Sequence, residues 1–259
     1  MTLELHHTDT GGDGPILVIL HGLFGSLDNW RSHIRVWQEQ YRVIAMDLRN
    51  HGRSPHAEGM SYDAMAQDVL AVLDQLDIRE CFLLGHSIGG KLAMTLARQQ
   101  AARVTGLIVA DIAPVAYEHG HDDIFRAMHA VEDAQPESRR EADEAMTTTI
   151  GTPAIRQFLS TNLVRDEWGV LGWRVGLEQI EADYAALAAA PAGETPYPGP
   201  ALVLRGDRSD YVPDSTHEAI MAVLPHASIE TLSGAGHWLH AEQPEAFRQA
   251  VDRFLKTAG

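Results

Sequence analysis

The sequence predicts an α/β protein with a mostly parallel central sheet flanked by helices, interrupted by one inserted helical segment. Two observations lead to this prediction. Short, continuous apolar runs alternate with patterns of helical spacing in the first and last parts of the chain, as expected for parallel strands buried on both faces. Between these parts, about 85 residues contain no candidate sheet strand, which is far too long for an ordinary crossover connection. With 259 residues the chain is long enough for one large domain with a sizeable core.

The first part of the chain begins with a strand, a helix and a second strand. The apolar runs Ile16 to Leu20 and Arg42 to Met46 are predicted strands, and the segment Asp28 to Gln38 between them has helical spacing. Helical spacing returns from Tyr62 to Leu76, and Ser61 stands in the position of an N-cap residue. The pattern is typical of a βαβ unit followed by another helix.

Further strands and helices follow in alternation. Cys81 to Leu84 and Val104 to Ala110 are apolar runs separated by a helix-forming stretch from Lys91 to Gln99. The last part of the chain contributes two more predicted strands and a closing helix, at residues 201–204, 228–232 and 242–255. The alternation favours a mainly parallel sheet with helices on both faces.

The long segment without strands is polar, helical in pattern and contains scattered aromatic residues. We therefore predict a helical lid at residues 115–198, inserted into a core formed by residues 1–114 and 199–259. The stretch Ala185 to Pro200 is rich in alanine and proline and is the expected return path to the sheet.

Charge and composition argue against several classes of function. The 36 acidic and 20 basic residues give a formal net charge of -16, so we expect no nucleic-acid partner and no contact with anionic lipid surfaces. The single cysteine, Cys81, cannot form an internal disulfide and is expected to be a small core residue. The N-terminus lacks a signal-peptide pattern, and no run of about 18 apolar residues occurs, so membrane insertion is not expected. These features favour a cytoplasmic protein; the oligomeric state is not predicted.

Ser87 lies in the middle of the sequence Gly85-His86-Ser87-Ile88-Gly89, between an apolar strand and a helix-forming stretch. This context predicts a nucleophile elbow, a sharp turn in which the serine has a strained backbone conformation and an accessible hydroxyl. The two flanking glycines leave room for the strand and the helix to meet. Without the strand and the helix, a serine between glycines would more often be an ordinary loop residue.

A serine hydroxyl becomes a good nucleophile only when a neighbouring base removes its proton, and a neutral histidine fits that role. Among the 14 histidines, His237 lies in a glycine-rich loop between the last strand and the last helix, at the same sheet edge as the elbow. We predict that His237 is the base; the alternative is a loop histidine that packs on Trp238. His86 would be turned away by the elbow geometry and is expected to be structural.

The carboxylate that orients this histidine is ambiguous. The turn after the strand Ala201 to Leu204 offers Asp210, but Ser209 stands where an acid is common, and a shift of one residue redirects a side chain. Asp111 ends the preceding strand at the same sheet edge and could reach the histidine from there. We favour Asp111, with Asp210 as the alternative acid; in the simpler interpretation Asp111 is a cap or hinge residue.

Acyl transfer also needs hydrogen-bond donors aimed at the developing oxyanion. The loop from His21 to Gly25 follows the first parallel strand and fits a donor loop, with the Leu23 amide as one donor. The Ile88 amide, next to the nucleophile, is the predicted second donor. His21 itself is expected to brace this loop. The predicted reaction requires no metal and no organic cofactor.

Two further groups of charged residues have structural interpretations. Asp47, Arg49 and His51 are expected to form a hydrogen-bonded brace at the sheet edge, because a turn with charged groups must satisfy them locally. The segment from His119 to Asp123 has the composition of a metal site, but its residues lack familiar ligand spacing. We expect a solvated face of the lid there.

These motifs together resemble the α/β-hydrolase superfamily across nearly all of the chain, and most of all the bacterial YbfF-type carboxylesterases. The resemblance rests on five segments, at residues 21–30, 47–54, 85–91, 111–115 and 234–238. It implies an α/β-hydrolase fold with a helical lid after the sixth strand, here Val104 to Ala110. It also implies an esterase for short- or medium-chain acyl esters, with thioesters possible. Because those relatives resemble this chain in lacking the usual acid after the seventh strand, the likeness supports Asp111.

Two alternatives to an esterase stay open. The first is a hydrolase of carbon–carbon bonds, or a related lyase, which would use the same three side chains with a different lid. The second is a ligand-binding protein that keeps the scaffold without catalysis, because a fold does not determine a function. Turnover of simple esters would separate the esterase from both.

Overall fold

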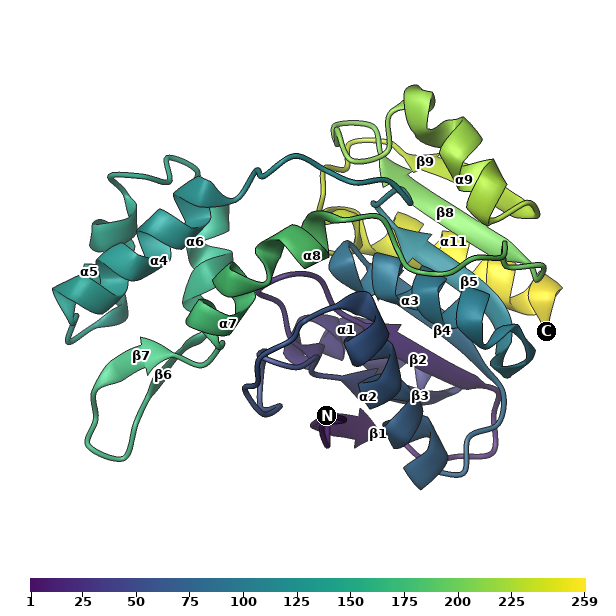
Figure 1. Cartoon of the computed structure of the whole chain (residues 1–259), viewed down its shortest axis with the longest axis horizontal. Helices are drawn as coiled ribbons and strands as arrows, with labels where there is room; N and C mark the ends of the chain where they lie inside the picture. Colours follow the sequence, from purple (N-terminus) through teal and green to yellow (C-terminus); the bar gives the residue numbers. More distant parts are fainter.

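A computed structural model describes all 259 residues. Seven strands form one sheet in the order β1-β3-β2-β4-β5-β8-β9, and all pairs are parallel except that between β1 and β3 at one edge (Figure 1). The strands of this sheet are β1 (His7–Asp9), β2 (Ile16–Leu20), β3 (Arg42–Met46), β4 (Cys81–His86), β5 (Val104–Ala110), β8 (Ala201–Gly206) and β9 (Ala227–Leu232). The mostly parallel sheet confirms the predicted fold class.

Eleven α-helices accompany the strands. Six belong to the part of the chain that forms the sheet: α1 (Arg31–Trp37), α2 (Tyr62–Gln75), α3 (Ile88–Gln99), α9 (His217–Val223), α10 (Leu239–Glu242) and α11 (Pro244–Ala258). The other five lie between β5 and β8: α4 (Asp122–Ala134), α5 (Arg139–Met146), α6 (Pro153–Ser160), α7 (Leu177–Ala182) and α8 (Tyr184–Ala188). Two helices after β8, α9 and α10, are not among the helices predicted from the sequence.

Helices cover both faces of the sheet because alternate residues of each strand point to opposite sides. In β2, Val18 and Leu20 belong to the larger apolar cluster, which also contains residues of α2, α3 and α9. Leu17 and Ile19 belong to a second cluster, with residues of α1 and α11. Strands buried on both sides explain the continuous apolar runs in the sequence.

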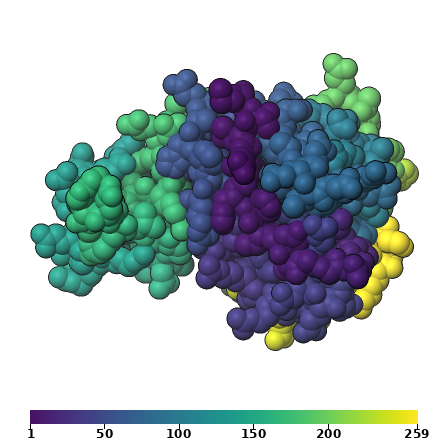
Figure 2. All heavy atoms as spheres, turned by 90° about the horizontal axis from the view of Figure 1, so that it is seen from below, coloured from purple at the N-terminus to yellow at the C-terminus, as the bar shows by residue number.

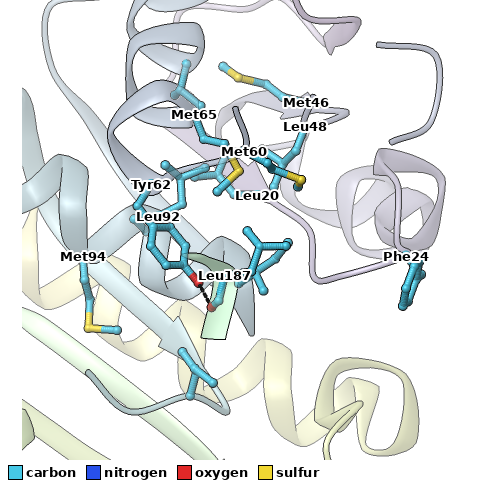
Figure 3. Close-up of a cluster of buried hydrophobic side chains, with 14 of the residues drawn as sticks. Leu20, Phe24, Met46, Leu48, Met60, Tyr62, Met65, Leu92, Met94 and Leu187 are labelled. Atoms are coloured by element: carbon cyan, nitrogen blue, oxygen red, sulfur yellow. Dashed lines mark hydrogen bonds between the residues drawn. The ribbon is translucent and has the colours of Figure 1, made fainter. Parts of the chain in front are cut away.

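The larger cluster extends from the sheet to the end of the inserted segment. Leu20 of β2, Met65 of α2 and Leu92 of α3 are almost fully buried in it, together with Leu187 of α8 (Figure 3). The hydroxyl of Tyr62 donates a hydrogen bond of 2.7 Å to the carbonyl oxygen of Leu187, as Figure 3 shows. The inserted segment is therefore packed against the core where it returns to the sheet.

The segment between β5 and β8 forms a lobe beside the sheet (Figures 1 and 2), with α8 next to the sheet and α5 at the outer edge in Figure 1. We call residues 115–198 the insertion. The strand before the insertion is β5. The resemblance to the family makes it the sixth strand, but it is the fifth along this chain, because only β1 precedes the first parallel strand. The boundaries at residues 114 and 199 and the role of the insertion as a lid remain predictions.

One part of the insertion is not helical. Leu163–Arg165 (β6) and Leu171–Trp173 (β7) form an antiparallel hairpin. Its turn is held by Asp166, whose Oδ1 accepts hydrogen bonds from the amides of Trp168 and Val170 at 2.9 and 2.8 Å. The prediction of a helical insertion did not include this hairpin, since strands of three residues are too short to show a two-residue period.

The exit of the insertion is fixed by main-chain contacts to the core. Lys91 of α3 is only 1% exposed, and its Nζ donates to the carbonyl oxygens of Ala188 and Ala189 at 3.0 and 2.5 Å. The ammonium group also lies 4.6 Å from the centre of the Tyr117 ring. Burial lowers the pKa of Lys91 to about 7.

None of the helices combines the length and apolar character needed to span a bilayer.

Candidate active site

Ser87 occupies a sharp turn between β4 and α3. Its φ of 54° lies in the left-handed region, which is strained for a residue other than glycine. A Cβ atom at Gly85 would lie 2.1 Å from the carbonyl oxygen of Gly89, and one at Gly89 would lie 2.4 Å from that of Leu20. Only glycine fits at both positions. The turn has the geometry of the predicted elbow.

His237 lies in the loop after β9, and its ring is held from two sides. Nδ1 lies 2.7 Å from Oδ2 of Asp111, and the ring stacks on that of Tyr211 with the centres 4.0 Å apart. Asp210, the alternative acid, is exposed and forms no hydrogen bond. The structure thus brings His237 together with Asp111 and leaves Asp210 apart. The catalytic role of Asp111 remains a prediction.

Asp111 is fully buried, and several donors converge on its carboxylate. Oδ1 accepts a hydrogen bond of 3.0 Å from the amide of Gly206, and Oδ2 also accepts one from the hydroxyl of Ser209. These donors hold the carboxylate in one orientation towards the histidine ring. Ser209 was seen in the sequence only as a departure from a common pattern, and its contact with Asp111 was not foreseen.

The two predicted oxyanion donors border the same space as Ser87. Ile88 is the first residue of α3, where a backbone N–H has no acceptor in the preceding turn. The amide of Leu23 forms no hydrogen bond within the chain. The loop around Leu23 is fixed by His51, whose Nε2 accepts a hydrogen bond of 3.0 Å from the amide of Phe24. Both amides are thus free to bind an anion.

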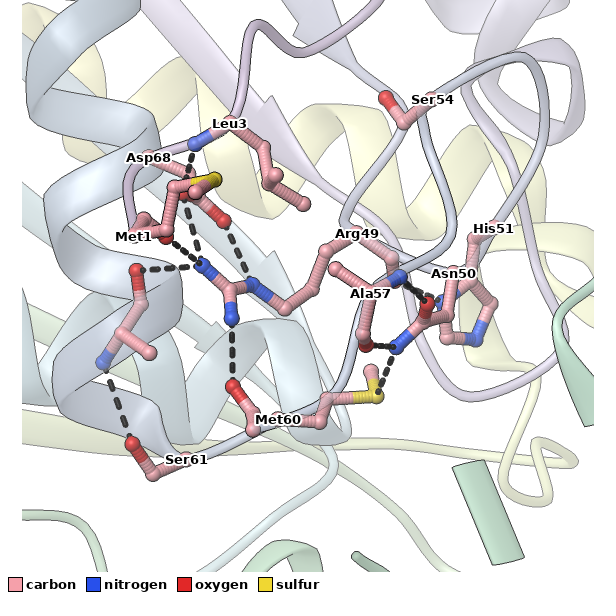
Figure 4. A network of polar contacts seen from close by, with 12 residues as sticks. Met1, Leu3, Arg49, Asn50, His51, Ser54, Ala57, Met60, Ser61 and Asp68 are labelled. Carbon is pink, nitrogen blue, oxygen red and sulfur yellow. Dashed lines mark hydrogen bonds and ion pairs between the residues drawn. The ribbon is translucent and has the colours of Figure 1, made fainter. Parts of the chain in front are cut away.

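The turn at residues 47–54 forms the expected brace, with one difference in pairing. His51 Nδ1 donates to the carbonyl oxygen of Arg49 at 2.9 Å, and Asp47 accepts the amide of Leu27 at 2.8 Å. The guanidinium of Arg49 makes two hydrogen bonds to Asp68 of α2, at 2.7 and 2.8 Å, rather than to Asp47 (Figure 4). Because both partners of this ion pair are buried, removing either would leave an unpaired charge.

Ser87 and His237 line one cavity of about 320 Å³, which we call the large chamber. Its wall on the insertion side is apolar and includes Ile155 and Phe158, and Phe158 packs against Trp238 with ring centres 5.3 Å apart. Its other wall combines apolar side chains with the polar groups of Asn29, His240 and Glu242. A cavity with an apolar body and a few polar groups is typical of a small-molecule site.

A second cavity of about 40 Å³, the small chamber, also borders Ser87. The two chambers share three lining residues, Leu23, Ser87 and His121. The remaining wall of the small chamber is largely apolar and includes Ile88 and Leu187. Ser87 therefore stands at the junction of a large and a small space.

His121 corrects the expectation of a fully solvated face at residues 119–123. Its side chain is half-buried, lines both chambers and contacts the hydroxyl of Tyr184 through Nδ1. Burial lowers its pKa to about 4. His119, in contrast, is exposed and pairs with Asp122 at 2.5 Å. No group of three or more His, Cys, Asp or Glu side chains has an arrangement suited to a metal ion.

Several histidines around the site are buried in the neutral form. Burial lowers the pKa of His21 to about 4 and the pKa values of His51 and His240 to about 3. His86 is buried as well, and its Nε2 bonds to the carbonyl oxygen of His237 at 2.8 Å, in line with the expected structural role. These side chains support the loops that carry the candidate catalytic groups.

These neutral histidines predict a steep loss of stability in acid. In the unfolded chain each takes up a proton below about pH 6.5, whereas in the folded chain it does so only near pH 3 to 4, so stability falls as the pH drops through this interval. Between about pH 7.5 and 5, each of His21, His51 and His240 should lower the free energy of unfolding by about 2 kcal/mol, or about 6 kcal/mol together. Urea unfolding at several pH values between about 7.5 and 5 measures this change in the free energy of unfolding.

The matched control for this prediction is His226→Gln, because His226 is exposed and forms no hydrogen bond. This variant should keep the steep dependence of the unfolding free energy on pH. A free energy of unfolding that stays constant between about pH 7.5 and 5 would contradict the assignment of buried neutral histidines.

Comparisons with a family pattern and with individual proteins both indicate the alpha/beta hydrolase family. The sequence pattern of the alpha/beta hydrolase fold family matches residues 15–244. The chain is 43% identical over 253 residues to the sn-1-specific diacylglycerol lipase ABHD11 of Xenopus laevis, covering 95% of this chain and 81% of that protein. It is 36% identical over 243 residues to the esterase YbfF of Escherichia coli, covering 92% of each chain. The resemblance found in the sequence is thereby confirmed.

A solved structure is also similar over nearly the whole chain. The structure of a marine microorganism esterase superimposes with a TM-score of 0.95 at 37% sequence identity, covering 98% of this chain and 100% of that one. The insertion is therefore part of the shared architecture.

Proposed function

The chain belongs to the alpha/beta hydrolase family, and on this premise we propose that it is a serine carboxylesterase for short- to medium-chain acyl esters. One observation carries the proposal: His237 lines the same cavity as Ser87, and its Nδ1 lies 2.7 Å from Oδ2 of Asp111. The similar proteins named esterase and lipase support an ester as the substrate. A cytoplasmic location and the lack of nucleic-acid partners remain predictions.

The proposed mechanism uses only groups of the chain and water. Neutral His237 accepts the proton of Ser87 through Nε2 as the serine oxygen attacks the ester carbonyl carbon. The amides of Leu23 and Ile88 donate hydrogen bonds to the oxyanion, and the Asp111 carboxylate stabilises the imidazolium. The protonated histidine then gives its proton to the departing alcohol. Water, activated by the same histidine, hydrolyses the acyl-enzyme.

The two chambers suggest how an ester is oriented. The alcohol oxygen must leave beside His237, which protonates it, and His237 lines only the large chamber. The alcohol half therefore belongs in the large chamber, and the acyl half in the small one. A chamber of about 40 Å³ holds about three heavy atoms, since one water-sized sphere needs roughly 10–15 Å³. With the carbonyl group at Ser87, acyl groups from acetyl to butyryl place one to three further carbon atoms in this space.

A series of p-nitrophenyl esters tests this orientation. We expect kcat/KM to be highest between acetate and butyrate and to fall at least about tenfold by octanoate, because longer chains must displace buried side chains. Leu187→Ala removes part of the small chamber's wall and should shift the optimum towards longer acyl chains. Leu177→Ala, in the insertion but in neither chamber, should leave the optimum where it is. An unchanged optimum in Leu187→Ala would place the acyl group elsewhere.

Labelling with a fluorophosphonate probe separates the proposed function from its alternatives. An esterase should be labelled at Ser87 and should turn over the ester series. Labelling without ester turnover would favour a carbon–carbon hydrolase, a lyase or a binding protein. Acyl thioesters of the same chain lengths would show in parallel whether thioesters are substrates as well.

A further inference from the structure

His240 lies in the wall of the large chamber and has no hydrogen-bond partner on its ring. It is only 6% exposed, and its Nδ1 is sealed from solvent without a partner. No residue of the chain bonds to Nε2 either, and Nε2 is not among the atoms sealed from solvent, so it is the ring nitrogen available to a molecule in the cavity that His240 lines. Buried polar atoms are nearly always paired, so an unpaired ring on a cavity wall points to a ligand.

The packing around His240 fixes the direction of its ring. The ring stacks on that of Trp30, with centres 4.5 Å apart and planes 11° from parallel. The ring of His86 is inclined to it by 60°, with the ring centres 4.6 Å apart. The ring is also neutral, because burial lowers its pKa to about 3. An N–H without an acceptor is rarer in proteins than an acceptor without a donor, which favours a proton on Nε2 rather than on the sealed Nδ1.

A second free donor lies next to Trp30 on the same wall. Asn29 lines the large chamber, and its Oδ1 accepts a hydrogen bond of 2.7 Å from the amide of Ser26. This contact fixes the orientation of the side-chain amide and leaves Nδ2 without a partner in the chain. Glu242, at the end of α10, adds a carboxylate to the same wall.

We propose that Asn29 and His240 form a subsite that binds a hydroxyl group on the alcohol half of the substrate. The alcohol half is assigned to the large chamber because His237 lines it, so the inference rests on the proposed function. Nε2 of His240 and Nδ2 of Asn29 donate to the hydroxyl oxygen, and the opposite wall accepts apolar carbon. The preferred substrates are thus short acyl esters of polyols, with a free hydroxyl near the ester.

Two esters of equal size test this subsite. 2-Hydroxyethyl butyrate and propyl butyrate differ only in a hydroxyl group in place of a methyl group at the end of the alcohol. After correction for their rates of hydrolysis by hydroxide, we expect kcat/KM of the unmodified protein to be about tenfold higher for the hydroxy ester, with about threefold from each of the two hydrogen bonds. A ratio near one would overturn the subsite.

Two variants remove the donors in different ways. His240→Phe keeps an aromatic ring for the stack on Trp30 but has no ring nitrogen, and Asn29→Asp keeps the acceptor for the Ser26 amide but replaces the donor. In each, the ratio of the two kcat/KM values should fall to about threefold or less, whatever the absolute rates. His226→Phe makes the same change at an exposed position outside the cavity and should keep the ratio.

The outcomes distinguish this inference from the proposed function. Hydrolysis of both esters with a ratio that persists in His240→Phe and in Asn29→Asp would overturn the subsite and leave the esterase proposal intact. Failure to hydrolyse either ester would overturn both. Thermal unfolding of each variant identifies one that does not fold, and the other variant then decides the result.

Discussion

Replacing Ser87 with alanine is expected to lower kcat/KM for p-nitrophenyl butyrate by about five orders of magnitude, since it removes the only oxygen that can form the acyl-enzyme. The residual rate would come from the oxyanion donors and from substrate binding. The fold should persist, because no residue of the chain hydrogen-bonds to the Ser87 hydroxyl, so alanine leaves no partner unsatisfied. Steady-state kinetics and thermal unfolding together check both parts of the expectation.

Ser215→Ala is a suitable control for this experiment, because Ser215 is exposed and its side chain forms no hydrogen bond. It should behave as the unmodified protein does in both measurements. Substantial ester turnover by purified Ser87→Ala would show that another group is the nucleophile and would end the proposed mechanism.

Asp111→Asn is expected to lower kcat by about three to four orders of magnitude. The amide has nearly the shape of the carboxylate, so the loss would come from chemistry rather than packing. An amide group facing His237 Nδ1 can favour the wrong tautomer, in which Nε2 carries the proton and cannot accept that of Ser87. An amide nitrogen facing His237 also stands where Oδ2 accepts the hydrogen bond of the Ser209 hydroxyl, and it cannot accept that bond.

Asp210→Asn provides the matched comparison, with the same chemical change at the other candidate acid. It should alter kcat by less than about twofold, since Asp210 is exposed and forms no hydrogen bond. Measuring the two variants side by side decides between the acids. A large loss in Asp210→Asn with little change in Asp111→Asn would reverse the assignment.

The sequence allowed the sheet and the elbow to be predicted because their signals are local. Strands buried on both faces appear as continuous apolar runs. The glycines that flank Ser87 lie within two residues of it in the sequence, where the elbow motif requires them. His237 could be singled out among the histidines by its place in a glycine-rich loop at the same sheet edge. Each of these needs little knowledge of tertiary packing.

The rest of the site depends on contacts between distant segments. The contact between Asp111 and Ser209 joins two strand ends that are 98 residues apart, and the sequence alone could not exclude Asp210. His121 stands in a polar segment, and the sequence does not distinguish it from its exposed neighbours. The packing of the insertion nevertheless places it in the cavity wall. His240 belongs to no sequence motif. Its lack of hydrogen-bond partners becomes visible only in the folded structure, where its ring packs on Trp30 and lines the cavity.

The exit of the insertion is held by Tyr62 and Lys91, and both contact carbonyl oxygens of the main chain rather than side chains. Every amino acid supplies such an oxygen, so this attachment places little demand on the identity of the residues it holds. During evolution the lobe could therefore exchange its residues, and with them its choice of substrates, while the junction with the catalytic scaffold stayed the same. Variation between related enzymes should accordingly concentrate in the lobe, with a lysine and a tyrosine retained beneath it.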